Sequence, residues 1–338
     1  MKYKLLLLAL IIVLSASACT STNKNSKSNK KDLVLITYDS FPKSGTSLNK
    51  ALKDFTKESG IKVKIANAGD TGTMLSKAAL TSGNPEGDVM WGIDNTYISK
   101  ARNKKIFIDS SITSVDYGDV CINYDKKFFK ENNLEIPKNF DDLIKPEYKG
   151  MLVAENPASS SPGLAFLLGT ISKYGESKWK NYWTSLKANE VKIVESWDSA
   201  YYEAFSGSSG KGKYPLVVSY ATSPAAEVVY SEEKINESPT GNIDGTCFRQ
   251  EEYAGILRGT KNTAEAKKLL DFLTSPEFQK EIPLNLFVYP SNKKVTLPVE
   301  FTKYASKITK PLSVNPKIIE KNRQTWIDDW TNIVMEQQ

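Results

Sequence analysis

The chain has 338 residues, of which 40% are hydrophobic and 25% are charged, a composition typical of a folded protein with a sizeable core. It contains no histidine, which excludes Ser-His-Asp triads, Cys-His pairs and almost all catalytic zinc sites. The formal net charge of +6 comes from six lysines in residues 1–31, because residues 32–338 carry 39 basic and 39 acidic residues. The net charge therefore gives no support to nucleic-acid binding, and we expect no nucleic-acid partner.

The first eighteen residues have the features of a signal peptide. Lys2 and Lys4 precede an unbroken apolar run over residues 5–14, which is about half the length that a membrane-spanning helix needs. Small residues suited to a signal peptidase follow at positions 15–18. We therefore expect residues 1–18 to direct export and to be removed.

Cys19 follows these small residues directly and resembles the lipidated cysteine of bacterial lipoproteins, although Ala16 replaces the leucine usual at its position. The alternative is an ordinary secretory signal that leaves Cys19 as a free thiol. Residues 19–31 are rich in Ser, Asn and Lys, which predicts a flexible tether. A basic tether beside a lipid anchor would favour anionic headgroups, so we expect the protein in the periplasm or on the outer surface of the cytoplasmic membrane.

Residues 33–124 alternate between strand and helix patterns. The first helix is expected to begin at Thr46, a favourable N-cap, and the second helix follows the turn at residues 69–72. Strands are predicted over residues 33–37, 61–65, 88–92 and 117–124.

The same alternation resumes after residue 150. Strands are predicted over residues 151–154, 191–194 and 216–220, and helices over 162–174, 179–186, about 198–205, 264–273 and 316–334. This order favours an α/β fold with a largely parallel sheet. No linker rich in Gly or Pro separates the two halves, which indicates two lobes joined by extended crossovers. We assign residues 32–117 and 224–300 to lobe 1, 118–223 to lobe 2, and 301–338 to a C-terminal helical segment that packs on both.

Two cysteines remain in the folded part of the chain. Cys121 and Cys247 are even in number and belong to an exported protein, which is compatible with a disulfide. They are equally compatible with two buried, small apolar residues. Both interpretations stay open.

Two helix starts carry polar groups suited to a ligand. Ser160 and Ser161 precede Pro162 at the start of a long apolar helix, and Asp70 and Thr71 open another. Ordinary capping needs only one such side chain, so the extra groups favour a polar-ligand site. Residues 207–213 have the spacing of a nucleotide phosphate loop but lack its Ser or Thr, and they lie between a helix and a strand in the wrong order. We interpret them as a solvated connection and expect no cofactor.

Aromatic residues follow three predicted strands. Tyr38 and Asp39 come after the first strand, Tyr220 ends a later one, and Trp197 lies at a strand-to-helix junction. Ligands gather beyond the carboxyl ends of strands in open α/β sheets. Rings beside carboxylates suit a flat cationic ligand, with each ring face contributing roughly 0.5–2 kcal/mol. No catalytic arrangement is found, so we expect a binding protein and not an enzyme.

Six motifs, in order over residues 33–333, resemble the bacterial thiamine-binding periplasmic proteins, which are solute-binding components of ABC importers. The motifs are Thr37-Tyr38-Asp39-Ser40-Phe41, Asp116-Tyr117-Gly118, Ser161-Pro162-Gly163-Leu164, Trp197-Asp198-Ser199-Ala200-Tyr201, Ser219-Tyr220-Ala221-Thr222-Ser223-Pro224-Ala225 and Tyr289-Pro290. The resemblance implies a type II periplasmic-binding-protein fold with a cleft between two lobes. It also implies a monomer that carries thiamine or its mono- or diphosphate to a membrane permease.

The resemblance also implies which residues bind the ligand. Asp70 and Thr71 match the ligand loop of the first lobe, and Ser160 and Ser161 match the pair that holds the phosphate or hydroxyethyl end. Trp197 matches a ligand-contacting tryptophan. The last contact strand corresponds to Tyr220, Ala221, Thr222 and Ser223.

Three positions depart from the family pattern: Ala226 replaces a tyrosine, Phe287 replaces a tryptophan, and the loop over residues 42–46 lacks a tryptophan. The resemblance still implies that Phe287 contacts the ligand, with a smaller ring. A ferric-iron binder of similar fold is one alternative, but Ala221 stands where that class has a second tyrosine. Polyamine or phosphonate binding and, less favoured, a thiamine-degrading enzyme with a cysteine nucleophile are the others.

Overall fold

Among residues 32–208 and 212–335, which this computed structural model describes, nine strands form one mixed sheet. The strand order is β2-β1-β3-β8-β4-β7-β5-β6, and β9 pairs with β4. Parallel strands form both ends of the sheet, whereas the pairs β3–β8, β8–β4 and β4–β7 are antiparallel. The expectation of a largely parallel sheet is therefore correct for the two ends and wrong for the centre.

The first half of the molecule is built on β1 (Leu33–Thr37), β2 (Val63–Asn67) and β3 (Val89–Asp94). Its helices include α1 (Ser47–Ser59), α2 (Thr71–Leu80) and α3 (Ile98–Asn103). Thr46 caps α1 through a reciprocal capping box with Asn49, as its position in the sequence predicts. The short helix η1 (Asp109–Ser111) leads into the centre of the sheet.

The second half is built on β5 (Leu152–Glu155), β6 (Lys192–Val194) and β7 (Leu216–Tyr220). Helices α5 (Ser161–Tyr174) and α6 (Trp179–Ala188) pack on it, and a π-helical turn, η4, covers Ser199–Ala204. The remaining elements of this half are α4 (Lys126–Glu131), η2 (Asp142–Ile144) and η3 (Pro146–Tyr148).

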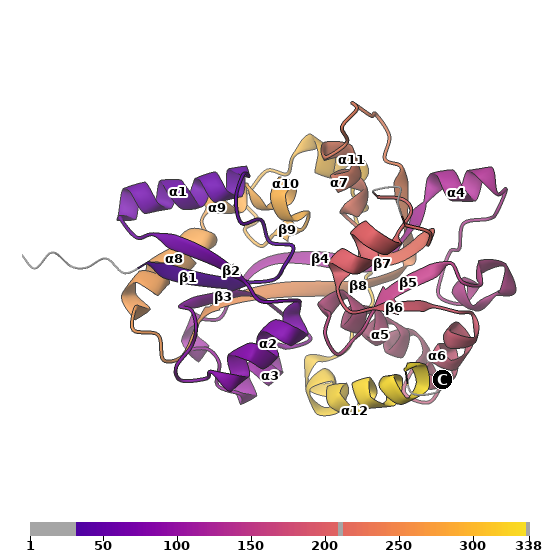
Figure 1. Cartoon of the computed structure of the whole chain (residues 1–338), viewed down its shortest axis with the longest axis horizontal. Coiled ribbons are helices and arrows are strands. Elements are labelled where there is room, and N and C mark those ends of the chain that lie inside the picture. The colour runs from indigo at the N-terminus through magenta and orange to yellow at the C-terminus, as the bar shows by residue number, and fades with distance from the viewer. Residues whose placement is uncertain (1–31, 209–211, 336–338) are drawn as a thin grey trace, which may run out of the picture. The chain divides into compact units, whose positions relative to one another are not determined.

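Two long central strands, β4 (Thr113–Asp125) and β8 (Thr240–Ile256), connect the halves (Figure 1). The end of β8 pairs with β3, and its start pairs with the end of β4, which in turn pairs with β7. The second crossing therefore lies within β8 and not at the predicted boundary between residues 223 and 224. That boundary is too early because residues 240–243 still pair beside the second half.

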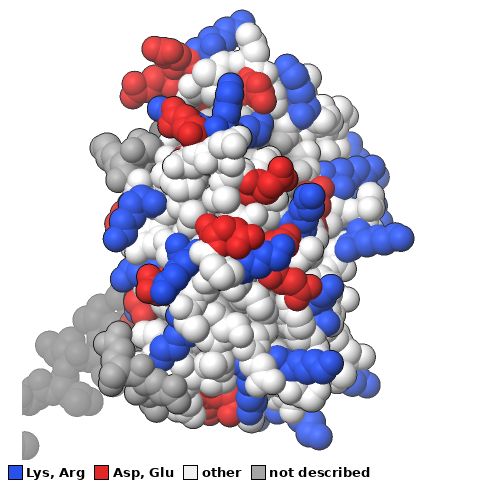
Figure 2. All heavy atoms as spheres, turned by 90° about the vertical axis from the view of Figure 1, so that its right-hand side faces the viewer, with Lys and Arg blue, Asp and Glu red and all other residues white. Residues whose placement is uncertain are grey.

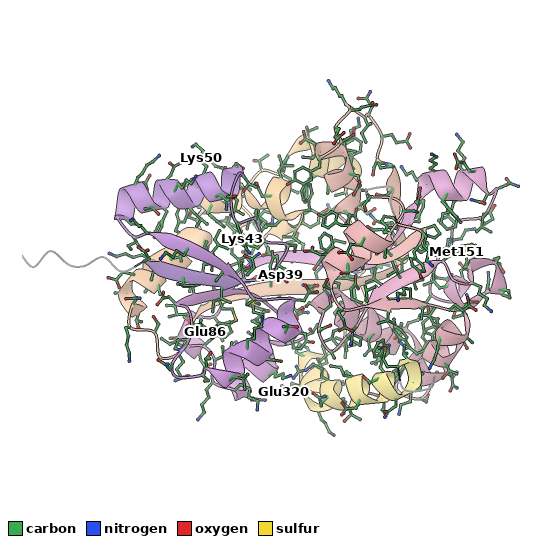
Figure 3. All side chains as sticks on the ribbon, in the orientation of Figure 1. Asp39, Lys43, Lys50, Glu86, Met151 and Glu320 are labelled. Carbon is green, nitrogen blue, oxygen red and sulfur yellow. A yellow bond between two sulfur atoms is a disulfide. The ribbon has the colours of Figure 1, made fainter. Side chains whose placement is uncertain are left out.

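The chain between and after these strands covers the sheet with short helices. They are α7 (Ser223–Val229), α8 (Thr263–Leu273), α9 (Pro276–Gln279), α10 (Ile282–Leu286) and α11 (Val299–Tyr304), with β9 at Tyr289–Pro290. Figure 3 shows side chains filling the space between these layers. In the described part of the chain, no helix combines the length and apolarity needed to cross a bilayer.

The last helix, α12 (Pro316–Val334), contacts both halves. Its Trp330 meets Trp183 of α6 at a ring-centroid distance of 5.5 Å, and its Arg323 donates to the Thr96 carbonyl, beside α3, at 2.7 Å. Figure 2 shows that acidic and basic side chains are interspersed on the face it displays. That face carries no continuous basic stripe.

A disulfide joins Cys121 of β4 to Cys247 of β8. Of the two interpretations left open by the sequence, the structure has the covalent pair. Both cysteines are buried and pack against Ala221 and Ile308. The bond therefore ties the two strands that connect the halves.

Candidate functional site

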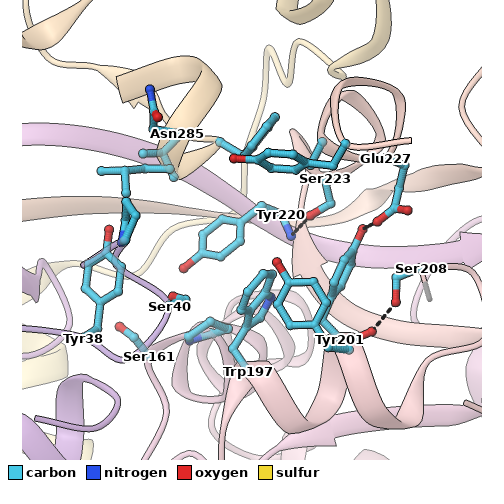
Figure 4. A pocket seen from close by; sticks show the side chains of 18 of the residues that line it. Tyr38, Ser40, Ser161, Trp197, Tyr201, Ser208, Tyr220, Ser223, Glu227 and Asn285 are labelled. Atoms are coloured by element: carbon cyan, nitrogen blue, oxygen red, sulfur yellow. Dashed lines mark hydrogen bonds between the residues drawn. The ribbon is translucent and has the colours of Figure 1, made fainter. Parts of the chain in front are cut away.

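A cavity of about 810 Å³ lies where the two halves face each other. Its lining comes from the end of β1, the starts of α2 and α5, the end of β7, the middle of β8 and residues 285–288. Figure 4 shows Tyr38 and Ser40 on one side, with Trp197 and Tyr201 across from them. Carboxyl ends of strands thus meet at the cavity, as expected for an α/β sheet.

One wall of the cavity is aromatic. Trp197 stacks on Tyr201 with ring centroids 5.0 Å apart and an interplanar angle of 13°, and it meets Tyr202 edge to face at 5.3 Å. The Trp197 Nε1 donates to the Ser219 hydroxyl at 2.9 Å. These contacts fix the indole, so it offers a preorganised ring face to a ligand.

Two tyrosine rings lie over glycines. A Cβ atom at Gly118 would be 2.9 Å from the Tyr220 ring, and one at Gly92 would be 2.5 Å from the Tyr38 ring. Gly92 also has a φ of 114°, a conformation that only glycine adopts without strain. The two glycines therefore let Tyr38 and Tyr220 settle at the base of the cavity.

Asp70 connects the two sides. Its Oδ2 accepts a hydrogen bond of 3.1 Å from the backbone N–H of Trp197, although the two residues belong to different halves. Burial raises the pKa of Asp70 to about 6. Nearby, the Gly72 N–H donates to the Ser159 carbonyl at 3.0 Å, and a Cβ at Gly72 would be 2.5 Å from the Ala158 oxygen. The halves are therefore in close contact on this side of the cavity.

Acidic side chains dominate the charge of the lining. Asp70, Glu227, Glu232 and Glu252 line the cavity, and no Lys or Arg of residues 32–208 and 212–335 does so. Glu227 accepts a hydrogen bond of 2.7 Å from the Tyr201 hydroxyl, and burial raises its pKa. Rings beside carboxylates are a combination that suits a flat cationic group.

Eight of the residues predicted from the sequence line the cavity. They are Tyr38, Asp70, Thr71, Ser161, Trp197, Tyr220, Ser223 and Phe287. Thr71 donates to the Gly92 carbonyl at 2.8 Å, whereas the Ser161 hydroxyl has no hydrogen-bond partner among the described residues. The Ser161 hydroxyl is thus available to a ligand at the start of α5.

Four predicted residues do not line the cavity. Asp39 (Figure 3) is exposed and accepts from the Gly69 N–H at 2.9 Å, while Ser160 is fully buried. Ala221 packs on the disulfide, because the residue after Tyr220 points the opposite way at a strand end. The Thr222 hydroxyl is buried and donates to the Phe287 carbonyl.

Several lining residues are missing from the sequence prediction. Tyr201 and Tyr202 lie on η4, and Gln250 and Glu252 lie on β8, a strand that is not predicted at all. Tyr230 also lines the cavity, one helical turn after Ala226, with its ring 5.2 Å from that of Phe287. The aromatic face that is absent at Ala226 is thus supplied from the next turn of the chain.

In the described part of the chain, no group of three or more Cys, Asp or Glu side chains is arranged to hold a metal ion. Both cysteines in this part are joined in the disulfide, so neither offers a free thiol. The cavity is therefore a set of rings, hydroxyls and carboxyl groups.

Comparison with known proteins places these features in a family. A family model described as bacterial extracellular solute-binding protein matches residues 38–280. The chain is 29% identical over 321 residues to the thiamine-binding periplasmic protein of Salmonella typhimurium strain LT2, covering 90% of this chain and 94% of that protein. It is also 29% identical to the thiamine-binding periplasmic protein of Escherichia coli strain K12, with the same two coverages.

Solved structures agree on the fold. A periplasmic thiamin binding protein superposes with a TM-score of 0.78 and 26% identity, covering 90% of this chain and 96% of that one. A ferric binding protein from Campylobacter jejuni superposes with a TM-score of 0.65 and 16% identity, covering 89% and 99%. The architecture is the two-lobe, type II periplasmic-binding-protein fold, with the cavity in the cleft between the lobes.

Proposed function

The chain belongs to the bacterial extracellular solute-binding proteins, and we propose that it binds thiamine in the interlobe cavity and delivers it to the permease of an ABC importer. One observation carries the proposal: the cavity combines a fixed aromatic wall with acidic side chains, and the described residues add no basic side chain to the lining. Thiamine consists of two flat rings, an aminopyrimidine and a cationic thiazolium, which suit this lining. The matches to thiamine-binding periplasmic proteins cover 90% of the chain.

The permease would recognise the closed, loaded protein. Strands β4 and β8 are the two chain segments that cross between the halves within the sheet, so they are the natural place for bending as the lobes close. We propose that the protein acts as a monomer, since the residues of one chain are enough to form a cavity of this size. Light scattering should give one mass near that of a single chain, with and without thiamine.

We further propose that thiamine is preferred over its phosphates. A phosphate group would add negative charge to a cavity lined by Asp70, Glu227 and Glu232. The Ser161 hydroxyl and the N–H groups at the start of α5 would offset only part of this repulsion. The expected order of affinity is thiamine, then the monophosphate, then the diphosphate.

Calorimetry with thiamine, its monophosphate and its diphosphate tests both the proposed ligand and the proposed order of affinity. Binding of thiamine with one ligand per chain is the expected result. Ferric ion and a polyamine such as spermidine serve as controls for other ligands of this fold. Tight binding of ferric ion or spermidine without binding of thiamine would contradict the proposed ligand, and a preference for the diphosphate would reverse the proposed order.

Transport and not catalysis is the proposed role. Thiamine degradation of the kind considered above requires a cysteine nucleophile, and the described cysteines are both oxidised. Thiamine incubated with the protein should be recovered unchanged by mass spectrometry. Appearance of free pyrimidine and thiazole products would overturn this role.

Cys19 and the tether lie outside the described residues. We propose that Cys19 is lipidated and holds the protein at the outer surface of the cytoplasmic membrane. The sequence around Cys19 supports the proposal, because small residues precede it and a basic segment follows. Mass spectrometry of the mature N-terminus should find a lipid on Cys19, and Cys19→Ala should move the protein to the soluble fraction. An unmodified N-terminus would contradict the anchor.

A further inference from the structure

Three buried carboxyl groups form a row across the centre of the sheet. Glu252 of β8 is the register partner of Asp94 on β3 and of Asp116 on β4. Asp94 and Asp116 are 0% exposed and Glu252 is 6% exposed. Of the three, Glu252 lines the ligand cavity. Burying three ionised carboxylates side by side costs free energy, so these groups must be protonated, share a proton or accept hydrogen bonds from neighbouring donors.

Asp116 and Glu252 are register partners, and Asp116 Oδ1 and Glu252 Oε2 are both buried with no hydrogen-bond partner among the described residues. A proton shared between the two carboxyl groups would satisfy both oxygens, whereas two ionised carboxylates have no proton to donate. The Trp91 Nε1 donates to Asp116 Oδ2 at 2.9 Å and stabilises Asp116 as the anion. Burial raises the pKa of both groups, and that of Glu252 well above its ordinary value. The hydrogen bond from Trp91 favours Asp116 as the ionised partner, so the shared proton would belong to Glu252, on the otherwise unpartnered Oε2.

Glu252 lines the cavity, and its protonated carboxyl group leaves one oxygen free to act as an acceptor. Its Oε1 accepts from Gln250 Nε2 at 3.1 Å, and Gln250 Oε1 in turn accepts from the Tyr220 hydroxyl at 3.3 Å. Oε2 receives no hydrogen bond from any N–H or hydroxyl group of the described residues, as expected for the oxygen that carries the proton. Gln250 thus holds the carboxyl group in one orientation at the cavity floor, and Oε1 retains a second lone pair.

We propose that Glu252 is a specificity-determining residue whose Oε1 accepts a hydrogen bond from an amino group on the ligand's aromatic ring. This inference rests on the proposed function, because the amino group meant is that of the thiamine pyrimidine. A ligand with a carbonyl in place of that amine would bring an acceptor against an acceptor. The floor would then reject it, since a buried polar group would lose its partner.

Two thiamine analogues test this directly with the wild-type protein. Oxythiamine replaces the amino group of the pyrimidine by an oxo group, whereas pyrithiamine keeps the aminopyrimidine and changes the cationic ring. We expect oxythiamine to bind about tenfold more weakly than thiamine, or worse, and pyrithiamine to bind within about threefold of it. Equal affinity for thiamine and oxythiamine would overturn the inference.

Two substitutions at the same position separate hydrogen bonding from charge. Glu252→Gln keeps an acceptor oxygen and offers an N–H to Asp116, so affinity and discrimination should stay within about threefold of wild type. Glu252→Leu removes the acceptor, so thiamine affinity should fall about tenfold while oxythiamine changes little. A large loss for Glu252→Gln would show that an ionised Glu252 binds the ligand, and would overturn the protonated form proposed.

Glu232→Leu is the matched control, because it removes a carboxylate from the exposed part of the lining. It should weaken thiamine and oxythiamine equally, leaving their ratio unchanged. If Glu252→Leu does not fold, the wild-type ratio and Glu252→Gln still decide the question. Failure of the wild-type protein to bind thiamine would refute the proposed function, whereas binding of thiamine without discrimination would refute this inference alone.

Discussion

The two sides of the cavity contribute different chemistry. The second half supplies a rigid aromatic wall in which Trp197 is stacked on Tyr201 and hydrogen-bonded to Ser219. The first half supplies Asp70 and Thr71 from the start of α2. The rings of the wall are held by contacts within their own half, whereas the Asp70 carboxylate accepts a hydrogen bond from the Trp197 backbone of the opposite half. From this difference we expect the second half to be preformed for the ligand and the first half to complete the site as the lobes close.

The largest expected effect is the loss of stability when the disulfide is removed. The bond closes a loop that contains the second half but not the first, so the second half should lose the most. Cys121 and Cys247 are 126 residues apart, and closing so long a loop restricts the unfolded chain. The double variant Cys121→Ala/Cys247→Ala should lose about 2–5 kcal/mol of unfolding free energy in urea titrations. The unmutated protein treated with a reductant serves as the control and should show the same loss. Unchanged stability in both would contradict this role of the bond.

The next largest expected effect is the loss of thiamine affinity when the Trp197 indole is removed from the aromatic wall of the second half. Trp197→Ala removes a stacked ring and its hydrogen bond to Ser219, so thiamine affinity should fall about 10- to 100-fold in calorimetry. Tyr230→Ala is the matched control, because that ring lies at the rim and is 61% exposed. Its loss should cost no more than about fivefold. Similar effects for both rings would remove the distinction between wall and rim.

The contribution of the first half should depend on pH. Burial raises the pKa of Asp70 to about 6, so the carboxyl group is increasingly protonated as the pH falls below that value. A cation binds the ionised form better, so affinity should be constant above pH 7 and fall about tenfold between pH 7 and pH 5. Asp70→Asn should bind more weakly at pH 7 and lose this dependence. A pH profile that Asp70→Asn leaves unaltered would assign the titration to another group.

Local patterns were sufficient to predict much of the fold. The bounds of β1, β7 and α12 agree with those expected, because compact β-prone runs, a Pro at the first helical turn and helical spacing are all local signals. β8 has no such signal. It contains glycines at positions 241 and 245 and several charged residues, which are unfavourable in a strand. Its pairing with β4 also includes register shifts, which no local pattern predicts.

The same limit applies to the cavity. Tyr38, Asp70, Trp197 and Tyr220 follow strands or open helices, so their position in the sequence indicated a common edge. Glu252 gives no such indication, because its importance comes from two register partners far away in the sequence. Alternation along a strand also decides between neighbours, since Tyr220 lines the cavity while Ala221 faces the disulfide. Which side chains face the cavity, and which lie opposite each other on neighbouring strands, depends on how the strands pair. A sequence motif does not contain this information.

The disulfide also changes what a proteolytic cut can do. A single cleavage anywhere between Cys121 and Cys247 leaves the two resulting fragments covalently joined. The nicked protein would keep its mass in a non-reducing gel and separate only after reduction. A cleavage on the amino side of Cys121 or the carboxyl side of Cys247 has no such protection. A cut within the second half therefore leaves one covalent molecule, whereas a cut within the first half leaves two fragments that only non-covalent contacts hold together.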